Sequence, residues 1–406
     1  MSADPTPRKI AFFGVFGAGN LGNECTLYAM LYNLRRYVPD AKIVCICTDP
    51  EGAASSYNIS ALPISGKPLP PINNAALRVL RRVFVWVPRE LYQCFRAAAR
   101  LKGTDMLIMT GTGMLGDFGI SPFGLHYEIL KWSIIAKLCR CKLLFVSVGA
   151  GPLRHPLSRF FVKAALGLAD YRSYRDAFSK DYLQGIGLDT TNDKVFPDLA
   201  FSLPTAVLPS THNRNGQGAV IGVGLMTYEG KRSVSEKNGA EYRDYVAKLA
   251  GFVTWLLEHK YNVRLLIGDA VWDQRVRQDL SELLKLKYGD DEKIIDVPAR
   301  TFEEVLSQLA ATDVVVASRF HNVLLALMLN KPVVAISYHE KVDALMNATG
   351  LSAFCHDIEH FETHRLVEQV TFIQKNAADI RLRIARSAEE NRTALDAQFD
   401  EIFRRV

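Results

Sequence analysis

The chain alternates short apolar runs with longer stretches in which apolar residues recur every three or four positions. In the first half, apolar runs of strand length are Lys9–Phe16, Ala41–Thr48, Asp105–Thr110 and Lys142–Val148. Stretches of helical period stand between them, namely Gly22–Tyr37, Ala75–Lys102 and Phe123–Cys139. Such alternation is typical of a doubly wound α/β protein with parallel sheets.

The same pattern restarts in the second half, after the polar, apolar-poor segment Pro209–Gly218. The strands expected there are Ala219–Leu225, Asn262–Ile267, Ile294–Val297, Asp313–Ala317 and Pro332–Ser337. Glu241–His259, Trp272–Lys287, Phe302–Ala311 and Val323–Leu329 are the expected helices. Two Rossmann-like domains facing a cleft, a glycosyltransferase-B-like architecture, are therefore the expected fold. The expected limits are 1–208, the linker 209–218, 219–364, and a charged helical tail over 365–406.

Two segments of the first half invite a more specific interpretation. Asp49–Asn74 is rich in proline, glycine and serine, and we expect a surface or lid loop there. Leu77–Arg100 mixes arginines with apolar residues such as Trp86, and Pro88 interrupts its pattern. That mixture fits a helix lying on a membrane surface, although an ordinary packed helix is the commoner explanation.

The composition is typical of a folded protein, and the mild excess of positive charge suits anionic small molecules or anionic membrane surfaces. The 406 residues are 49% hydrophobic and 23% charged, and the net charge is +6. No block of basic residues with interleaved aromatics favours nucleic acid. The amino terminus lacks the features of a signal peptide, no apolar window approaches membrane-span length, and the seven cysteines show no disulfide spacing. We therefore expect a cytoplasmic protein, free or at the inner face of the membrane.

The segment Ser318-Arg319-Phe320-His321 carries the strongest chemical signal. It follows a buried strand and precedes an apolar helix. Ligands of parallel sheets bind at the carboxyl ends of strands, where these side chains stand. Arginine binds phosphate or carboxylate with a fixed fork, and histidine transfers protons near neutral pH. An anionic substrate and a proton transfer are therefore expected.

Three strands of the first half end in glycine clusters. Gly17-x-Gly19-x-x-Gly22 has the form of a dinucleotide fingerprint, a weak signal here because Asn20, Asn23 and Glu24 are not typical of it. The other two clusters contain Gly111 and Gly113, and Gly149 and Gly151. Tight packing turns and a floor under a substrate both account for these glycines.

Each of the other candidate site residues has both a functional and a structural explanation. Arg175 and Lys341 follow strands and would add positive charge to the site. Alternatively, Arg175 forms a surface ion pair with a nearby acid, and Lys341 is a solvated lysine at the start of a helix. His126 stands in a helix after the second glycine cluster, near enough for a ligand contact or simply packed. His356, His360 and His364 recur every four residues, so they mimic a zinc site on one helical face, although a solvated polar face is favoured. Buried thiols are the favoured explanation for the Cys-x-Cys pairs at 45–47 and 139–141.

In this order, these motifs resemble those of the polysaccharide pyruvyl transferase family. The resemblance covers residues 9 to about 350 and rests on an ordered set of short motifs. They are Gly19-Asn20-Leu21-Gly22-Asn23-Glu24, Gly111–Gly113, Val148–Leu153, Tyr174–Asp176, Phe196–Asp198, Ser318–His321, Tyr338 and Lys341.

The resemblance implies a glycosyltransferase-B-like fold and phosphoenolpyruvate as co-substrate, with no metal and no further cofactor. The pyruvyl group would become a ketal on a saccharide of a surface or exopolysaccharide, the acceptor being free or lipid-linked. Arg319 and His321 would form the donor site, with Arg175 as a second anion ligand. The expected substrate-binding residues are Gly19, Asn20, Asn23, Glu24, Gly111, Gly113, Asp117, His126, Gly149, Gly151, Ser318, Tyr338 and Lys341.

The chain departs from the family pattern at Asn23, where an aspartate is usual. If that aspartate is the base toward the acceptor hydroxyl, its role here passes to Glu24 or Asp117. Two other functions stay open. A nucleotide-sugar glycosyltransferase would share the architecture, with Glu340 or Asp343 as its acidic ribose ligand. A non-catalytic binding protein is suggested by Asn23. The acceptor sugar and assembly into a homo-oligomer are left undetermined.

Overall fold

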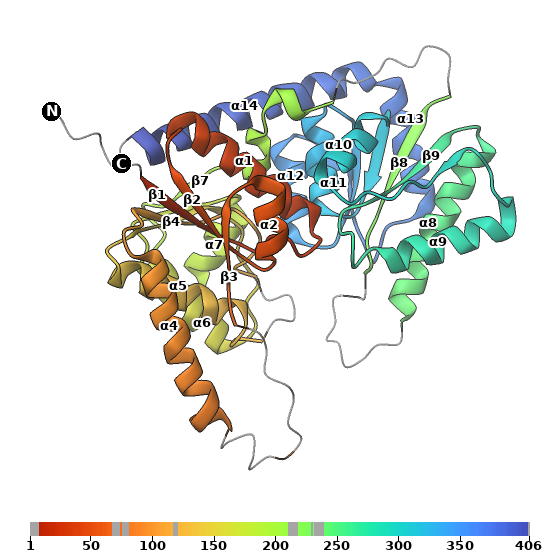
Figure 1. The fold of residues 1–406 in the computed structure, drawn as a ribbon. Coiled ribbons are helices and arrows are strands. Elements are labelled where there is room, and N and C mark those ends of the chain that lie inside the picture. The colour runs from red at the N-terminus through yellow and green to blue at the C-terminus, as the bar shows by residue number, and fades with distance from the viewer. Residues whose placement is uncertain are drawn as a thin grey trace. The chain divides into compact units, whose positions relative to one another are not determined.

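A computed structural model of the chain describes residues 8–66, 74, 81–116, 121–209, 218–228, 230 and 239–404 (Figure 1). These residues form two compact units. The first contains the described residues up to Ala18, then Thr26–Leu199 and the described residues from Phe399 onward. The second contains the described residues of 200–398 together with Gly19–Cys25.

The first unit contains a parallel sheet of seven strands in the order β3-β2-β1-β4-β5-β6-β7. Its strands are β1 (Lys9–Phe13), β2 (Lys42–Cys47), β3 (Ser60–Pro63), β4 (Met106–Met109), β5 (Lys142–Val148), β6 (Tyr171–Tyr174) and β7 (Lys194–Val195). The helical elements in this part of the chain are α1 (Leu21–Tyr37), α2 (Pro50–Tyr57), the π-helical turn η1 (Arg82–Trp86), α4 (Val87–Leu101), α5 (Leu125–Leu138), α6 (Pro156–Gly167) and α7 (Ala177–Gly185).

The second unit contains a parallel sheet of six strands in the order β10-β9-β8-β11-β12-β13. These are β8 (Val220–Leu225), β9 (Asn262–Ile267), β10 (Ile294–Ile295), β11 (Val314–Ala317), β12 (Val333–Ser337) and β13 (Cys355–Asp357). Its α-helices are α8 (Ala240–Glu258), α9 (Gln274–Tyr288), α10 (Phe302–Ala310), α11 (Phe320–Met328), α12 (Glu340–Ala348), α13 (Thr363–Lys375) and α14 (Ala377–Arg404). The last turns of α14 belong to the first unit. Short 3-10 turns are η2 (Leu199–Ser202), η3 (Thr205–Val207) and η4 (Ser352–Phe354).

Each sheet has a point where the order of its strands reverses. In the first sheet this point lies between β1 and β4, and in the second between β8 and β11. Right-handed crossovers place the helices on opposite faces on either side of such a point, which opens a crevice at the carboxyl ends of the two central strands. The expected fold class of two Rossmann-like domains is confirmed.

The expected lid loop over Asp49–Asn74 is wrong in its first part, where α2 and β3 stand instead. The Asp49 carboxylate caps α2 by accepting a hydrogen bond from the Gly52 N–H at 3.1 Å. Asn58 ends the helix in a left-handed conformation, with φ of 50°. Helix α2 consists largely of small residues, which give a loop-like composition, and residues 67–73 lie outside the described part of the chain.

Other differences from the expected fold concern where a strand and the two units end. The strand expected over Lys9–Phe16 ends at Phe13, where the chain turns into its glycine cluster. The units divide at Leu199, before the expected linker, of which residues 210–217 are not described. Within the described residues, no helix is both long enough and apolar enough to cross a membrane.

Candidate functional site

Arg319 and His321 stand at the reversal point of the second sheet. They follow β11, which lies beside β8, and His321 is the second residue of α11. Backbone N–H groups at a helix amino terminus have no partner inside the helix and favour anions. The position expected for this motif, at the carboxyl end of a central strand, is confirmed.

The Arg319 guanidinium is held by the carboxylate of Asp273. Its Nε lies 2.9 Å from Oδ2, and its Nη2 lies 2.5 Å from Oδ1. Burial acts to lower the pKa of Arg319, but the hydrogen bond and charge of Asp273 outweigh it and raise that pKa. The Arg319 side chain is 21% exposed, so part of this fixed cation is accessible to a ligand.

Asp273 is itself fully buried and organises the loop after β9. Its carboxylate accepts hydrogen bonds from the backbone N–H groups of Thr227, Gly268 and Asp269, at 3.1, 3.3 and 3.0 Å. One side chain thereby joins the ends of β8 and β9 to Arg319 after β11. Asp273 was not predicted from the sequence. The Gly268-Asp269 pair directly after an apolar run was the available signal for this loop.

The glycine-rich turn near the amino end meets this loop within the second unit. Asn20 pairs with Asp269 in an antiparallel bridge, and the Leu21 N–H donates to the Gly268 carbonyl at 3.3 Å. The Asn20 Oδ1 accepts from the N–H groups of Gly22 and Asn23, at 3.2 and 3.3 Å, which begins α1. Two segments almost 250 residues apart in sequence therefore share one site.

Gly22 brings the two motifs into direct contact. A Cβ atom at this position would lie 1.9 Å from the Nδ1 of His321, so the imidazole packs against the bare backbone. Phe320 holds the ring from another side, edge-on with centroids 5.2 Å apart. Glycine is required here by the proximity of His321.

Lys341 adds a second cation near this motif, as expected. Its Nζ lies 4.8 Å from the ring centroid of Tyr338 and 5.8 Å from that of Phe320. These contacts follow from the parallel pairing of β11 with β12. Glu24 and Asn23 lie in the first turn of α1 and are partly exposed.

Ser318 and His126 are corrections to the expected set of substrate-binding side chains. Ser318 is fully buried, and its hydroxyl shares a hydrogen bond of 2.9 Å with Tyr245. His126 is fully buried too, with Nε2 3.2 Å from the Gly116 carbonyl oxygen. Both side chains stabilise the core and are closed to a ligand. Asp117 lies outside the described residues.

Glycines 111, 113, 149 and 151 follow neighbouring strands of the first sheet, so the expected common edge is confirmed. Close packing explains two of them. A Cβ at Gly111 would lie 2.6 Å from the Ser147 carbonyl oxygen, and one at Gly149 would lie 2.6 Å from the Arg175 guanidinium. A floor under a substrate stays a prediction.

Arg175 is buried in the first unit between two carboxylates. Its Nη1 lies 3.4 Å from Asp198 Oδ2, and its Nε lies 3.4 Å from Asp176 Oδ2. Its side chain is 6% exposed, which differs from the surface ion pair considered above. Its role as an anion ligand stays a prediction.

The three histidines expected on one helical face are not on one helix. His356 lies in β13, His360 in the following turn and His364 in α13. His360 instead comes close to Asp357 and Glu359, whose ligand atoms lie within 4.8 Å of one another and of its own. The Glu359 carboxylate also accepts a hydrogen bond from Tyr228 at 2.5 Å.

Two parallel-sheet α/β units, each with a point where its strand order reverses, define the class of proteins with a glycosyltransferase-B-like fold. A UDP-GlcNAc 2-epimerase from Neisseria meningitidis bound to UDP-GlcNAc is similar, with a TM-score of 0.60 and 11% identity over 97% of this chain and 99% of that one. The Anabaena protein HepE, in complex with UDP and glucose, gives 0.60 and 12% over 98% and 100%. A glycosyltransferase from Rickettsia africae gives 0.61 and 11% over 98% of each chain. At these identities, the similarity concerns the fold alone.

Residues 20–340 match the polysaccharide pyruvyl transferase family, and the chain belongs to this family of transferases. The resemblance inferred from the motifs is thereby confirmed. No curated protein matches the chain.

Proposed function

We propose that this protein transfers the pyruvyl group of phosphoenolpyruvate to two hydroxyls of a saccharide, forming a ketal and releasing inorganic phosphate. The saccharide belongs to surface or exopolysaccharide biosynthesis. The observation that supports this most is the joining of Arg319, His321 and the turn from Asn20 to Glu24 in one unit. A cation, a proton donor and a carboxylate then stand on neighbouring elements.

Arg319 binds the donor in this proposal. Phosphoenolpyruvate carries about three negative charges at neutral pH, from its phosphate and its carboxylate. Arg319 stays charged and is fixed by Asp273, so it offers its remaining N–H groups without a large loss of conformational entropy. Lys341 and the amino terminus of α11 add to the positive potential. This chain's own residues thus supply the cations that the donor requires.

His321 supplies the proton. It transfers a proton to the methylene carbon of the donor, which becomes a methyl group, while the first sugar hydroxyl attacks the adjacent carbon. The bond to the phosphate oxygen then breaks, and the second hydroxyl replaces the phosphate. One hydroxyl proton restores His321 and the other leaves with phosphate. Glu24, in the same unit, or Asp117 first accepts one of these hydroxyl protons, which Asn23 cannot do, and passes it on to His321 or to the phosphate.

A thermal-shift experiment tests donor binding, with phosphoenolpyruvate compared against a panel of nucleotide sugars. A ligand at about 100 times its Kd stabilises the folded state by about 2.7 kcal/mol, which is readily measured. We expect a shift with phosphoenolpyruvate in the wild type that is lost in Arg319→Ala and retained in the exposed control Arg365→Ala. A shift with a nucleotide sugar alone would instead support glycosyl transfer.

Turnover is then measured as phosphate release, with mass spectrometry of the saccharide product. His321→Ala should retain the thermal shift and lose about 10²–10⁴-fold in turnover, the usual contribution of a general acid. Unchanged turnover in this variant would exclude His321 as the proton donor.

A further inference from the structure

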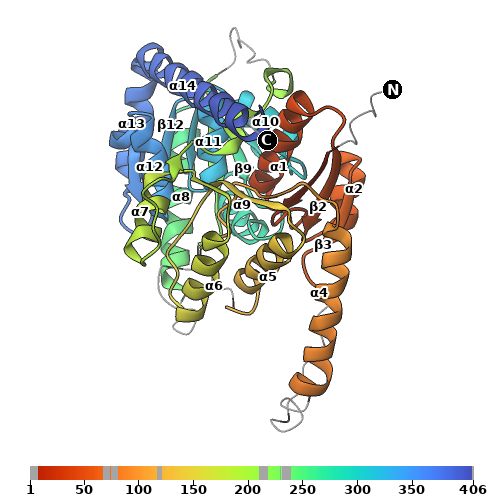
Figure 2. The same cartoon turned by 90° about the vertical axis from the view of Figure 1, so that its left-hand side faces the viewer.

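A row of large apolar side chains on α4 and the turn before it is exposed to solvent. Phe84 is 72% exposed, Leu91 58% and Phe95 76%. Val87, Leu91 and Phe95 follow one another at intervals of four, so they share one face of the helix. In both views, the amino-terminal half of α4 extends away from the rest of its unit (Figures 1 and 2). Exposed rows of this kind usually mark an interaction surface.

The apolar surface continues from η1 onto the neighbouring helices through aromatic contacts. The ring of Trp86 lies 6.4 Å from that of Tyr127, which lies 5.9 Å from that of Phe161. Phe123, 50% exposed, and Phe160, 61% exposed, each contact the Phe161 ring, with centroids 5.9 and 5.8 Å apart. Aromatic side chains are enriched where proteins meet the membrane interface.

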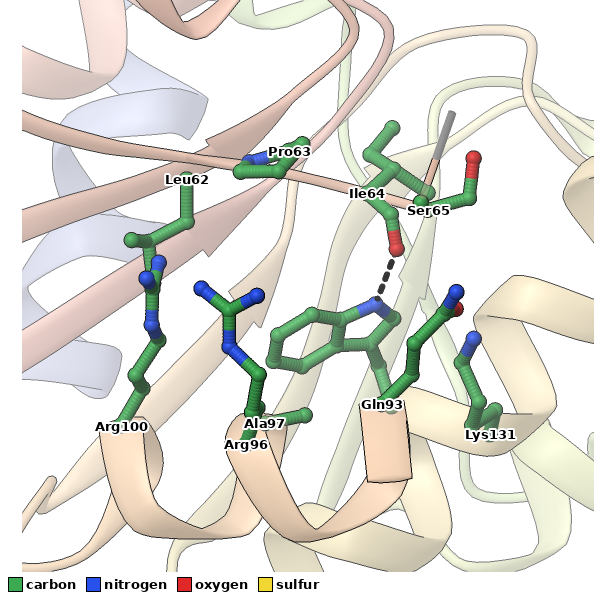
Figure 3. Close-up of a pocket in the computed structure, with 11 residues that line it drawn as sticks. Leu62, Pro63, Ile64, Ser65, Gln93, Arg96, Ala97, Arg100 and Lys131 are labelled. Carbon is green, nitrogen blue, oxygen red and sulfur yellow. Dashed lines mark hydrogen bonds between the residues drawn. The ribbon is translucent and has the colours of Figure 1, made fainter. Parts of the chain in front are cut away.

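Basic residues lie on another side of α4, about 160° around the helix from the apolar row. Arg89, Arg96 and Arg100 lie at i, i+7 and i+11, so they share a second face of the helix with Gln93. Arg96 and Arg100 extend from α4 over a shallow hollow, which the end of β3 and α5 also line (Figure 3). The Arg96 guanidinium lies 5.7 Å from the ring centroid of Tyr92, which joins the basic face to the apolar one.

A third face of α4, between the apolar row and the basic face, is firmly packed. Ala97 and Leu101 are buried in the core of the first unit, and the carboxylate of Glu90 pairs with Lys131 at 2.8 Å. The helix therefore cannot turn its apolar row inward without breaking this packing. The exposed surface is a preformed feature of the fold.

We infer that this α4 surface docks the protein onto a bilayer that contains anionic phospholipids. The apolar side chains enter the interfacial layer, and the arginines bind lipid phosphates at its border. The positive charge of these arginines favours an anionic bilayer over a neutral one. The inference depends on the first unit alone and is independent of the proposed reaction.

Flotation with vesicles tests the inference. Vesicles of phosphatidylcholine alone are compared with vesicles that also contain phosphatidylglycerol, at low and high salt. The wild type should float with the anionic vesicles, and less so at high salt. Leu91→Glu/Phe95→Glu should reduce binding at least about 10-fold, because two large apolar groups no longer enter the interface. Arg96→Glu/Arg100→Glu should remove the preference for anionic lipid.

The matched control is Leu286→Glu/Leu382→Glu, which changes two leucines that are 87% and 72% exposed in the second unit. It should float like the wild type. The inference would be overturned if the wild type failed to float with anionic vesicles, or if Leu91→Glu/Phe95→Glu floated equally well. Dissociation of a dimer by this variant, without an effect on flotation, would assign the surface to contact between copies instead. Equal melting temperatures show that the variants are folded.

Discussion

Gly22 contributes to the site by lacking a side chain. Its position in the first turn of α1 allows the His321 imidazole to lie where a Cβ would stand. Its backbone is not in the left-handed region, so the conformation itself accepts any residue. The identity of this residue is fixed by its neighbour.

Gly22→Ala should therefore displace the His321 ring while leaving the backbone of α1 intact. Alanine favours the helix by about 1 kcal/mol relative to glycine, but displacing the ring costs about 1–3 kcal/mol, so stability should fall only slightly. Turnover should fall by about 10²–10⁴-fold, as expected for loss of the general acid. Melting temperature and phosphate release measured on the same sample separate the two effects.

Gly251 provides the comparison for that variant. It lies inside α8 in the same unit, and an added Cβ would meet Thr363 at ordinary distances of 3.7 Å or more. Gly251→Ala should keep full turnover and gain stability. Normal turnover in Gly22→Ala would show that His321 can act from another position.

Sequence could identify Arg319 and His321 because both stand beside a long apolar run that fixes their place in the sheet. It could not identify Asp273, which is 46 residues from Arg319 and becomes its partner only when β9 and β11 enter one sheet. It also could not separate His126 from a ligand-binding histidine, since only tertiary packing shows that its imidazole is buried.

The elements themselves follow from the sequence to differing degrees. The limits of β5 and β9 agree with prediction because each is a mostly apolar run, interrupted only by Ser147 or Arg264, with polar or turn residues at its ends. Helix α2 was missed because its alanines, glycine and serines carry little apolar periodicity. The helix depends on a local feature, its cap by Asp49, and on a tertiary one, its packing beside β2 and β3.

The packing of α4 on α5 depends on a buried group of three charges. Lys131 lies between Glu90 and Glu128, at 2.8 and 2.7 Å, and all three side chains are largely buried. Burial raises the pKa of Glu128, and the charge of Glu90 adds to this, whereas Lys131 opposes both. Burial lowers the pKa of Lys131, but the two carboxylates outweigh it and raise that pKa.

Lys131→Met should destabilise the protein by about 3–5 kcal/mol at pH 7, because two buried carboxylates lose their cation. The pKa of Glu128 in the folded state then rises further above its unfolded value, so the folded state binds more protons. Stability must therefore increase as pH falls from neutral toward the ordinary glutamate range. Urea unfolding of this variant at several pH values measures the slope.

The exposed pair of Lys137 and Asp170 serves as the control for that change. Burial acts to raise the pKa of Asp170, but the hydrogen bonds from Lys137 and the Leu143 N–H outweigh it and lower that pKa. Lys137→Met should have a small effect of about 1 kcal/mol or less, as for other surface pairs. If Lys131→Met and Lys137→Met lost the same amount of stability, burial would not strengthen the ion pairs of Lys131 with Glu90 and Glu128.

At the scale of the whole molecule, one helix contributes to both cores. Residues of α14 up to Gln398 belong to the second unit, and those from Phe399 onward belong to the first. Phe399 is fully buried, with its ring 6.5 Å from that of Tyr37 and stacked on that of Phe403 at 6.1 Å. Leu395, one turn earlier, is fully buried and belongs to the second unit. Neighbouring turns of one helix thus belong to different units.

Phe399→Ala should lower the free energy of unfolding by about 3–5 kcal/mol, because it leaves a cavity. We expect the first unit to be destabilised. Hydrogen exchange should then show lower protection in β1, β4 and β5 than in the wild type, with β8, β11 and β12 nearly unchanged. Leu395→Ala should give the reverse pattern, with the loss in the second sheet. If both variants lower protection equally in both sheets, the two units unfold as one cooperative structure, and α14 then couples their stabilities instead of serving each separately.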